Sequence, residues 1–378
     1  MSDAGMGPRF TPLIEALPAT VPFVGPEAAE RRHGRAFRAR LGANESVFGP
    51  SPAAVEAMRA EAADAWKYGD PESWLLREAL AARHGIDMGN LVVGAGIDGL
   101  LNSLVRLTVG PGNPVVTSLG AYPTFSYHVR GYGGQLHEVP YRDDFEDPDA
   151  LAVRAHETRA KLVYLANPDN PMGGFHGRAR VAALLDALPG DTLLVLDEAY
   201  ADFAPNDDLL PVDTADPRLI RLRTFSKAHG LAGARVGYAI GARPLIAAFE
   251  KVRNHFGMSR VGQAGALAAL SDTAWLDHVR AEVAAGKARI ADIASENGLK
   301  SLPSHANFVA IDMGAGPELA TAMVAALGEA GVFVRMPFAG PERRCIRVTA
   351  GRPADLDILA ETFSPALDRA RSVLVNGL

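Results

Sequence analysis

Short apolar runs alternate with helical patterns between residues 91 and 240, and this alternation limits the folds available to the chain. Strands that alternate with helices favour a mostly parallel sheet covered by helices on both faces. In such a sheet, ligands bind beyond the carboxyl ends of the strands. The sequence therefore predicts an α/β fold, with strands at 91–93, 115–118, 161–166, 192–196, 219–222 and 236–240.

Polar or aromatic residues follow three of these strands. The third predicted strand runs into Asn-Pro-Asp-Asn-Pro-Met-Gly-Gly at 167–174, a turn that would present side-chain amides outward. An ordinary turn explains this motif equally well. The fourth is followed by Asp197. A carboxylate buried there needs a cationic partner, which could be a protonated pyridine nitrogen or the cation of a structural salt bridge. Tyr122, after the second strand, could cover a planar cofactor or pack in the core.

A lysine lies between hydroxyl residues in the segment at 223–237, which reads Arg-Thr-Phe-Ser-Lys-Ala-His-Gly-Leu-Ala-Gly-Ala-Arg-Val-Gly. Its small and apolar neighbours predict a partly desolvated amine at Lys227, as a Schiff-base lysine requires. Thr224, Ser226 and Arg235 could bind a phosphate through two hydroxyls and a planar guanidinium. An amine beside a dianion site is what pyridoxal phosphate needs. A surface loop with an exposed lysine is the alternative.

A second phosphate-binding signal is the Gly-Ala-Gly sequence at 94–96, which lies between a predicted strand and a helical pattern. A strand, a glycine turn and a helix start can together hold an anion on backbone N–H groups. Glycines also occur at such positions for tight packing. The motif by itself therefore supports both explanations equally.

Length and composition indicate a globular protein and exclude several functions. The 378 residues are enough for one large domain and a smaller one. A formal charge of −6 without a dense basic run argues against nucleic-acid binding. Cys345 is the only cysteine, so neither an internal disulfide nor a thiolate metal site can form, and no metal is expected. No apolar segment is long enough to cross a membrane and no secretion signal begins the chain, so we expect a cytoplasmic protein.

Several short motifs occur together in a specific order. They are Asn44-Glu45, Gly49-Pro50-Ser51-Pro52, Tyr122-Pro123, the turn at 167–173, Asp197-Glu198-Ala199-Tyr200, the segment at 224–237, Ala306-Asn307-Phe308 and Ile346-Arg347-Val348. With these motifs the chain resembles fold-type-I pyridoxal-phosphate aminotransferases over about residues 40–365, and among them the histidinol-phosphate aminotransferase branch. The resemblance implies transamination between an L-amino donor and a 2-oxo acid such as 2-oxoglutarate.

The resemblance also implies an aspartate aminotransferase-like division of the chain. Residues 1–40, which are rich in proline, would form an arm that joins the small domain and a partner subunit. Residues 41–250 would form the large cofactor-binding domain, with a mostly parallel, seven-stranded-type sheet covered by helices. Residues 251–378 would form a smaller α+β domain, with a long linking helix near 245–295. Its predicted strands are 307–313, 332–336 and 345–349, and its predicted helices include 318–327 and 354–373.

The family's cofactor residues can be transferred to this chain one at a time. Lys227 would bond to the cofactor's aldehyde, and Asp197 would pair with its pyridine nitrogen. Tyr200 together with Asn170 would hold the ring oxygen, and Tyr122 would lie against the ring face. Lys227, Asp197 and Tyr200 are therefore the expected catalytic residues. The phosphate would meet Thr224, Ser226, Arg235 and the backbone of Ala95, Gly96 and Ile97.

The resemblance further implies a homodimer whose active sites are shared between subunits. Tyr68 matches the tyrosine that reaches the phosphate in the neighbouring subunit. Arg347 matches the arginine that binds the anionic end of the substrate, and Arg335 matches a second arginine near it. Asn44 matches an asparagine in the entry strand on the substrate side.

Some residues depart from the family pattern, and several of them lie on the substrate side. Phe23 stands where relatives carry a tyrosine near the substrate phosphate, so one hydroxyl contact would be missing. Asn-Pro-Met-Gly at 170–173 replaces Asn-Pro-Thr-Gly, and the segment at 254–259 replaces the usual Pro-Tyr-Pro. The donor could therefore be an aromatic or another amino acid, and a lyase or decarboxylase reaction on this scaffold stays open. A non-catalytic cofactor-binding module is disfavoured, because the lysine is intact.

Overall fold

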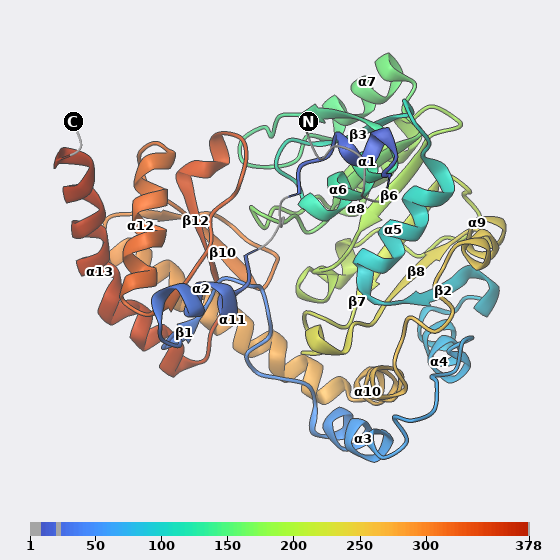
Figure 1. Cartoon of the computed structure of the whole chain (residues 1–378), viewed down its shortest axis with the longest axis horizontal. Coiled ribbons are helices and arrows are strands. Elements are labelled where there is room, and N and C mark those ends of the chain that lie inside the picture. The colour runs from blue at the N-terminus through green and yellow to red at the C-terminus, as the bar shows by residue number, and fades with distance from the viewer. Residues whose placement is uncertain (1–8, 20–23, 377–378) are drawn as a thin grey trace, which may run out of the picture.

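A seven-stranded sheet forms the centre of the larger part of the molecule (Figure 1). The computed structural model describes residues 9–19 and 24–376, and the prediction for Phe23 falls outside them. The strands are β2 (Leu91–Gly94), β3 (Pro114–Ser118), β4 (Gln135–Val139), β5 (Leu162–Ala166), β6 (Leu193–Asp197), β7 (Leu219–Thr224) and β8 (Gly237–Gly241), in the spatial order β2-β8-β7-β6-β5-β3-β4. All neighbouring pairs are parallel except those of β8, so the prediction of a mostly parallel sheet is confirmed.

The apolar pattern predicted every strand of this sheet except β4. The predicted strands agree with the observed ones to within two residues at each end. β4 lies at the edge of the sheet beside β3, and its sequence Gln-Leu-His-Glu-Val is mostly half-buried or exposed. An edge strand has a neighbour on one side only and carries polar residues. It therefore has no continuous apolar run from which it could be predicted.

Alternating side chains of the central strands fill two separate cores. In β5, Leu162 and Tyr164 pack on one face of the sheet, whereas Val163 and Leu165 pack on the other. Successive side chains in a strand point to opposite faces, so a strand covered on both sides is apolar throughout. The covering helices are α3 (Pro52–Ala62), α4 (Trp74–His84), α5 (Gly96–Thr108), α6 (Pro123–Gly131), α7 (Pro148–Thr158), α8 (Arg178–Ala187), α9 (Arg243–Ala248) and α10 (Arg260–Ser271).

A second, smaller unit is built mainly from the C-terminal part of the chain (Figure 1). Its strands are β9 (Lys300–Ser301), β10 (Phe308–Asp312) and β12 (Cys345–Thr349) in one antiparallel sheet, and β1 (Ala39–Arg40) paired in parallel with β11 (Val332–Phe333). Its helices are α11 (Thr273–Glu296), α12 (Pro317–Glu329) and α13 (Pro353–Asn376). Two short helices, α1 (Pro12–Glu15) and α2 (Pro26–His33), come before β1 in the sequence. No helix among the described residues is both long and apolar enough to span a membrane.

The segment near 245–295, predicted to hold a long linking helix, is divided into α9, α10 and α11. The longest of these, α11, starts only at Thr273. α10 packs with α3 and α4 against the large sheet. In contrast, Ala39 and Leu41 pack in the apolar core of the second unit. Packing thus crosses the predicted limits at 40 and 250, and the division into domains stays a prediction.

The carboxyl ends of the central strands bring distant residues to one edge of the sheet. Ala166 at the end of β5 lies opposite Asp197 at the end of β6. On the other side, Thr224 at the end of β7 pairs with Gly237, which pairs in turn with Gly94 of β2. Residues from five strands therefore meet there. This is the edge at which the sequence predicts ligand binding.

A buried ion pair next to this edge joins Glu198, the residue after β6, to arginines of β7. Arg221 donates two hydrogen bonds to Glu198, at 3.0 and 2.6 Å, and both side chains are only 1% exposed. Arg223 adds a third hydrogen bond to the same carboxylate at 2.9 Å. Burial by itself raises the pKa of Glu198, but Arg223 and Arg221 outweigh it and hold that pKa below its usual value.

Breaking this buried pair should destabilise the protein strongly. Glu198→Gln leaves the Arg221 guanidinium buried without its counterion, and we expect the free energy of unfolding to fall by about 3–5 kcal/mol. Urea denaturation of the purified protein measures this loss. Glu361→Gln is the matched control, because it breaks an exposed ion pair with Arg38, and exposed pairs contribute little. Equal losses in the two variants would contradict this interpretation.

Candidate active site

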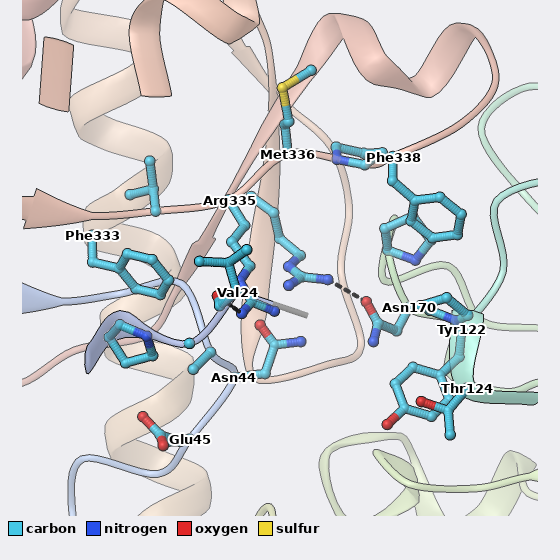
Figure 2. A pocket seen from close by; sticks show the side chains of 18 of the residues that line it. Val24, Asn44, Glu45, Tyr122, Thr124, Asn170, Phe333, Arg335, Met336 and Phe338 are labelled. Carbon is cyan, nitrogen blue, oxygen red and sulfur yellow. Dashed lines mark hydrogen bonds between the residues drawn. The ribbon is translucent and has the colours of Figure 1, made fainter. Parts of the chain in front are cut away.

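A cavity of about 1620 Å³ lies where the carboxyl edge of the large sheet faces the second unit (Figure 2). Both units line it, together with the segment that connects β1 to α3. The predicted site residues that line it are Asn44, Ile97, Tyr122, Asn170, Asp197, Tyr200, Thr224, Ser226, Lys227, Arg235, Arg335 and Arg347. Tyr68 lies outside this cavity: it is 78% exposed, and its ring packs 4.8 Å from that of Phe256.

Lys227 lies three residues after the end of β7, with its side chain half-buried. Phe225 and Ala228 beside it are buried. Nζ donates a hydrogen bond to the backbone carbonyl of Asn44 at 3.1 Å and lies 5.5 Å from the centre of the Tyr200 ring. A neutral carbonyl therefore holds the amine inside the cavity, where it can form a covalent bond with a ligand.

Thr224, Ser226 and Arg235 converge at one side of the cavity. Thr224 Oγ1 donates to Ser226 Oγ at 3.0 Å, and Arg235 Nη1 donates to the same oxygen at 3.4 Å. Gly96 begins α5 with φ +74°, and a Cβ added to it would lie 2.5 Å from Arg235 Nη2. The helix start at Ala95 has no side-chain cap, so its backbone N–H groups remain for a ligand. Two hydroxyls, a guanidinium and a helix N-terminus together fit a phosphate dianion.

Asp197 ends β6 with its carboxylate buried. The Tyr164 hydroxyl donates to Oδ2 at 2.7 Å, and the Ala199 N–H donates to Oδ1 at 3.0 Å. Burial raises the pKa of Asp197 to about 6, although both hydrogen bonds act in the opposite direction. Glu198 takes both arginines of β7, and no cation in the described part of the chain pairs with Asp197. The salt-bridge alternative is therefore unsupported, and a protonated pyridine nitrogen fits this carboxylate.

The turn at 167–174 presents one amide to the cavity. The Asn167 side chain exchanges two hydrogen bonds with the backbone of His176 and is buried. Asn170 lines the cavity, and its Oδ1 accepts a hydrogen bond from Arg347 Nη1 (Figure 2). The prediction of outward-pointing amides is therefore wrong for Asn167, because the turn uses that amide to satisfy its own backbone.

Tyr200 and Tyr122 both face the cavity and are held by different partners. Tyr200 OH accepts a hydrogen bond from Asn44 Nδ2 at 2.8 Å, and its ring packs edge-on against Phe308. Tyr122 immediately precedes α6 and donates its hydroxyl proton to Asp98 Oδ1 at 2.9 Å. Burial raises the pKa of Tyr122 above its usual value, so this phenol stays neutral at physiological pH. Packing and hydrogen bonds thus hold both rings in place.

Arg335 and Arg347 lie on adjacent backbone segments, where the Arg347 N–H donates to the Arg335 carbonyl at 2.6 Å. The Arg347 side chain is buried, lies 5.2 Å from the Phe308 ring centre and donates to Asn170, but its Nε has no partner among the described residues. Burial lowers the pKa of Arg347 to about 10, so the group remains a cation at neutral pH. Burial also lowers the pKa of Arg335, which donates to the Val24 carbonyl at 2.6 Å.

Sequence patterns assigned no role to Tyr164, Asp98 or Thr349. Tyr164 bonds to Asp197, and a hydroxyl inside a buried apolar run was the signal that could have revealed it. Thr349 lies two residues after Arg347 on β12, and side chains two apart share a face of a strand. That spacing was a usable signal as well. Asp98 lies in the first turn of α5, and nothing in the sequence marks it.

Known proteins resemble this chain over most of its length. The sequence matches the aminotransferase class I and II family over residues 39–363. Histidinol-phosphate aminotransferase of Erythrobacter litoralis is 37% identical over 378 residues, which cover 98% of this chain and 100% of that protein. The enzyme of the same name from an Anaeromyxobacter species is 38% identical over 309 residues, 81% of this chain and 85% of that protein.

Solved structures share the fold. The crystal structure of histidinol-phosphate aminotransferase from Sinorhizobium meliloti, in complex with pyridoxal-5'-phosphate, has a TM-score of 0.93 and 51% sequence identity over 97% of this chain and 98% of that one. Aspartate aminotransferase from Thermus thermophilus with maleate has a TM-score of 0.81 at 24% identity, over 95% and 100% of the two chains. The second likeness shows the common fold alone.

The family match and the likeness to a structure that contains pyridoxal-5'-phosphate define the chain as a pyridoxal-phosphate-dependent aminotransferase. The chain belongs to the aminotransferase class I and II family, and its sequence is similar to those of histidinol-phosphate aminotransferases. The predicted family, fold class and cofactor are thereby confirmed.

A side chain at position 96 should weaken cofactor binding. Gly96→Ala places a methyl group against Arg235 and disfavours the left-handed backbone at the start of α5. We expect the dissociation constant for pyridoxal phosphate to rise about 10–100-fold, the equivalent of one lost hydrogen bond to an ionised group. Fluorescence titration of the cofactor-free protein measures it. Gly131→Ala, where an added Cβ meets nothing within 4 Å, is the control and should bind normally. Normal binding by Gly96→Ala would place the phosphate elsewhere.

Proposed function

We propose that the chain transfers the amino group of histidinol phosphate to 2-oxoglutarate. Relatives named histidinol-phosphate aminotransferase, which align with nearly the whole chain, support this donor. Transamination with pyridoxal phosphate itself follows from the family. The cavity further supports a donor that carries an anionic group.

The environment of Arg347 is the observation that carries this proposal. The guanidinium is buried and pairs with no carboxylate in the described ranges, and its Nε lacks a hydrogen-bond partner. A buried charge without a counterion is costly, so an anionic ligand stabilises it. A planar guanidinium binds phosphate or carboxylate through two parallel hydrogen bonds. The phosphate of histidinol phosphate and the carboxylates of 2-oxoglutarate both meet this requirement.

The residues at the sheet edge divide into groups that hold the cofactor and a group that moves a proton. When bound, pyridoxal phosphate supplies an aldehyde that takes up the donor amine and a ring that accepts electrons from its α-carbon. Asp197 would face its ring nitrogen, and its phosphate would be held by Thr224, Ser226 and Arg235. Lys227, once its amine is free, is the base that can move a proton at the donor's α-carbon. The Asn44 carbonyl keeps that amine inside the cavity.

Replacing Arg347 should affect phosphorylated and unphosphorylated donors differently. Arg347→Lys should lower kcat/KM for histidinol phosphate by about 10–100-fold, because lysine cannot reproduce the two parallel hydrogen bonds. Histidinol, which lacks the phosphate, should lose far less. The rates should be measured in single turnovers without 2-oxoglutarate. The acceptor also needs an anion site, and its omission restricts the measurement to the reaction of the donor.

Arg343→Lys is the control for this experiment, because Arg343 is exposed and does not line the cavity. It should leave the rates with both donors unchanged. Equal losses for both donors in Arg347→Lys would mean that Arg347 supports the structure and that the phosphate binds elsewhere. A donor screen in which an aromatic amino acid reacts faster than histidinol phosphate would overturn the proposed donor.

The proposal includes a cytoplasmic homodimer with shared active sites. Tyr68 lies outside the cavity of its own chain, next to Phe256. Trp66, Trp74 and Leu75 in the same region are 80%, 50% and 63% exposed. Large apolar side chains gathered on a surface favour a protein interface. The cavity also exceeds the roughly 300–1,000 Å³ of ordinary ligand sites, as expected where a second chain closes it.

Mixed dimers should recover activity that their parents lack. In a dimer of one Lys227→Ala chain and one Tyr68→Phe chain, one site carries both changes and the other carries neither. Mixing the two inactive or weakly active proteins through mild denaturation should therefore restore turnover. The control is the Lys227→Ala protein alone, treated in the same way, and it should stay inactive. An active monomer in sedimentation, or no gain on mixing, would refute the shared site.

A further inference from the structure

Asn44 connects the two units within the cavity (Figure 2). Only 2% of this residue is exposed. Its Nδ2 donates to Tyr200 OH at 2.8 Å, and its backbone N–H donates to Thr349 Oγ1 at 3.2 Å. Its carbonyl accepts hydrogen bonds from Lys227 Nζ and Asn307 Nδ2, both at 3.1 Å. One residue therefore contacts the lysine and the tyrosine at the sheet edge as well as two residues of the second unit.

The backbone conformation of Asn44 permits these contacts. Its φ of +55° lies in the left-handed region, which asparagine adopts more readily than most other residues with a side chain. The carbonyl then bonds to Lys227 while the side chain bonds to Tyr200. Glycine adopts the same conformation without strain. Asn44→Gly would therefore remove the amide and keep the carbonyl where it is.

Thr349 determines which way the Asn44 amide points. Thr349 Oγ1 accepts from the Asn44 backbone N–H and donates its own proton to Asn44 Oδ1, also at 3.2 Å. Reversing the amide would exchange Oδ1 for an NH₂ group, which cannot accept that proton. The hydroxyl thus favours the orientation in which Nδ2 faces Tyr200.

Tyr200 accepts this hydrogen bond and donates none to any group in the described part of the chain. Tyr200 is only 3% exposed, and it lines the cavity. Because Asn44 occupies one lone pair, the hydroxyl proton is left for a ligand in the cavity. A hydroxyl that accepts a hydrogen bond also donates a stronger one, since linked hydrogen bonds polarise one another.

We propose that Asn44 is a positioning residue: its amide, oriented by Thr349, directs the Tyr200 hydroxyl proton toward the ring oxygen of bound pyridoxal phosphate. The inference rests on the proposed cofactor role of Tyr200. It differs from the role expected from the sequence, in which Asn44 meets the substrate. It also assigns a function to Thr349, to which the sequence patterns gave none.

The test is the pH midpoint of the holoenzyme's visible absorbance, measured without an amino donor. A hydroxyl that donates to the ring oxygen stabilises the anionic form of that oxygen, so a weaker donation raises the midpoint. Asn44→Gly should raise it by about half a unit to one unit, the equivalent of one hydrogen bond. Thr349→Val should raise the midpoint by less, because the Asn44 amide stays in place but is no longer held in the orientation that donates to Tyr200. Thr349→Ser keeps the hydroxyl and should leave the midpoint unchanged.

These variants leave the local charges as they are. Lys227 Nζ lies 5.5 Å from the centre of the Tyr200 ring, and Arg347 and Tyr122 interact electrostatically with Tyr200; none of the substitutions adds or removes a charge. A shift of the midpoint therefore reports the hydrogen bond. Circular dichroism shows whether each variant folds. If Asn44→Gly does not fold, Thr349→Val compared with Thr349→Ser decides the question, and equal midpoints in that pair would overturn the proposal.

Tyr200→Phe separates this inference from the role of Tyr200 itself. Alone, it should raise the midpoint, and Asn44→Gly added to it should cause no further change, because both act through one hydrogen bond. An unchanged midpoint in Tyr200→Phe would refute the cofactor role of Tyr200. Two results would show that the positioning role of Asn44 is wrong. In the first, Tyr200→Phe shifts the midpoint but Asn44→Gly does not. In the second, Asn44→Gly shifts the midpoint equally in the wild-type and the Tyr200→Phe backgrounds.

Discussion

Strand pairing in the large sheet decides where chemistry can occur in this protein. Parallel strands end at the same edge, so Asp197 of β6 lies between the ends of β5 and β7. The antiparallel β8 lies between β7 and β2, and its Gly237 pairs with Thr224 on one side and with Gly94, just before the start of α5, on the other. The acid, the phosphate site and the lysine that follows β7 are thus assembled by backbone hydrogen bonds. Their separation along the chain, which exceeds a hundred residues, has no effect on their proximity.

Buried charges with and without counterions separate structural groups from functional ones. Glu198 and Asp197 are adjacent and equally buried, yet arginines neutralise only Glu198. Glu198 therefore stabilises the sheet, whereas the carboxylate of Asp197, whose pKa burial raises to about 6, remains for a cationic ligand group. Arg347 presents the opposite charge in the same cavity, also without an ion-pair partner in the described ranges. In the proposed function, Asp197 faces the cationic ring of the cofactor and Arg347 faces an anionic group of the substrate.

The second unit contributes more than the arginine that we propose binds the substrate. β12 carries Arg347 and Thr349 on one face, so a single strand supplies both the proposed anion-binding group and the hydroxyl that bonds to the Asn44 amide. Asn44 in turn holds Lys227 and Tyr200 from the large sheet. The geometry of Lys227 and Tyr200, the groups proposed to move or donate protons, therefore depends on the contact between the two units.

The sequence by itself determined the central strands and the residues at their ends. A strand covered on both faces must be apolar throughout, so its end can be located in the sequence where polar residues begin. The position of Asp197 at the end of β6 could be predicted for this reason, and the edge strand β4, which lacks such a run, could not. Only the tertiary structure decided the hydrogen-bond partners: Asn44 meets Tyr200 and Thr349, 156 and 305 positions away, and Asn170 meets Arg347 instead of pointing free. Local patterns record burial and turn formation, whereas a hydrogen bond between distant residues depends on packing and leaves no trace in neighbouring residues.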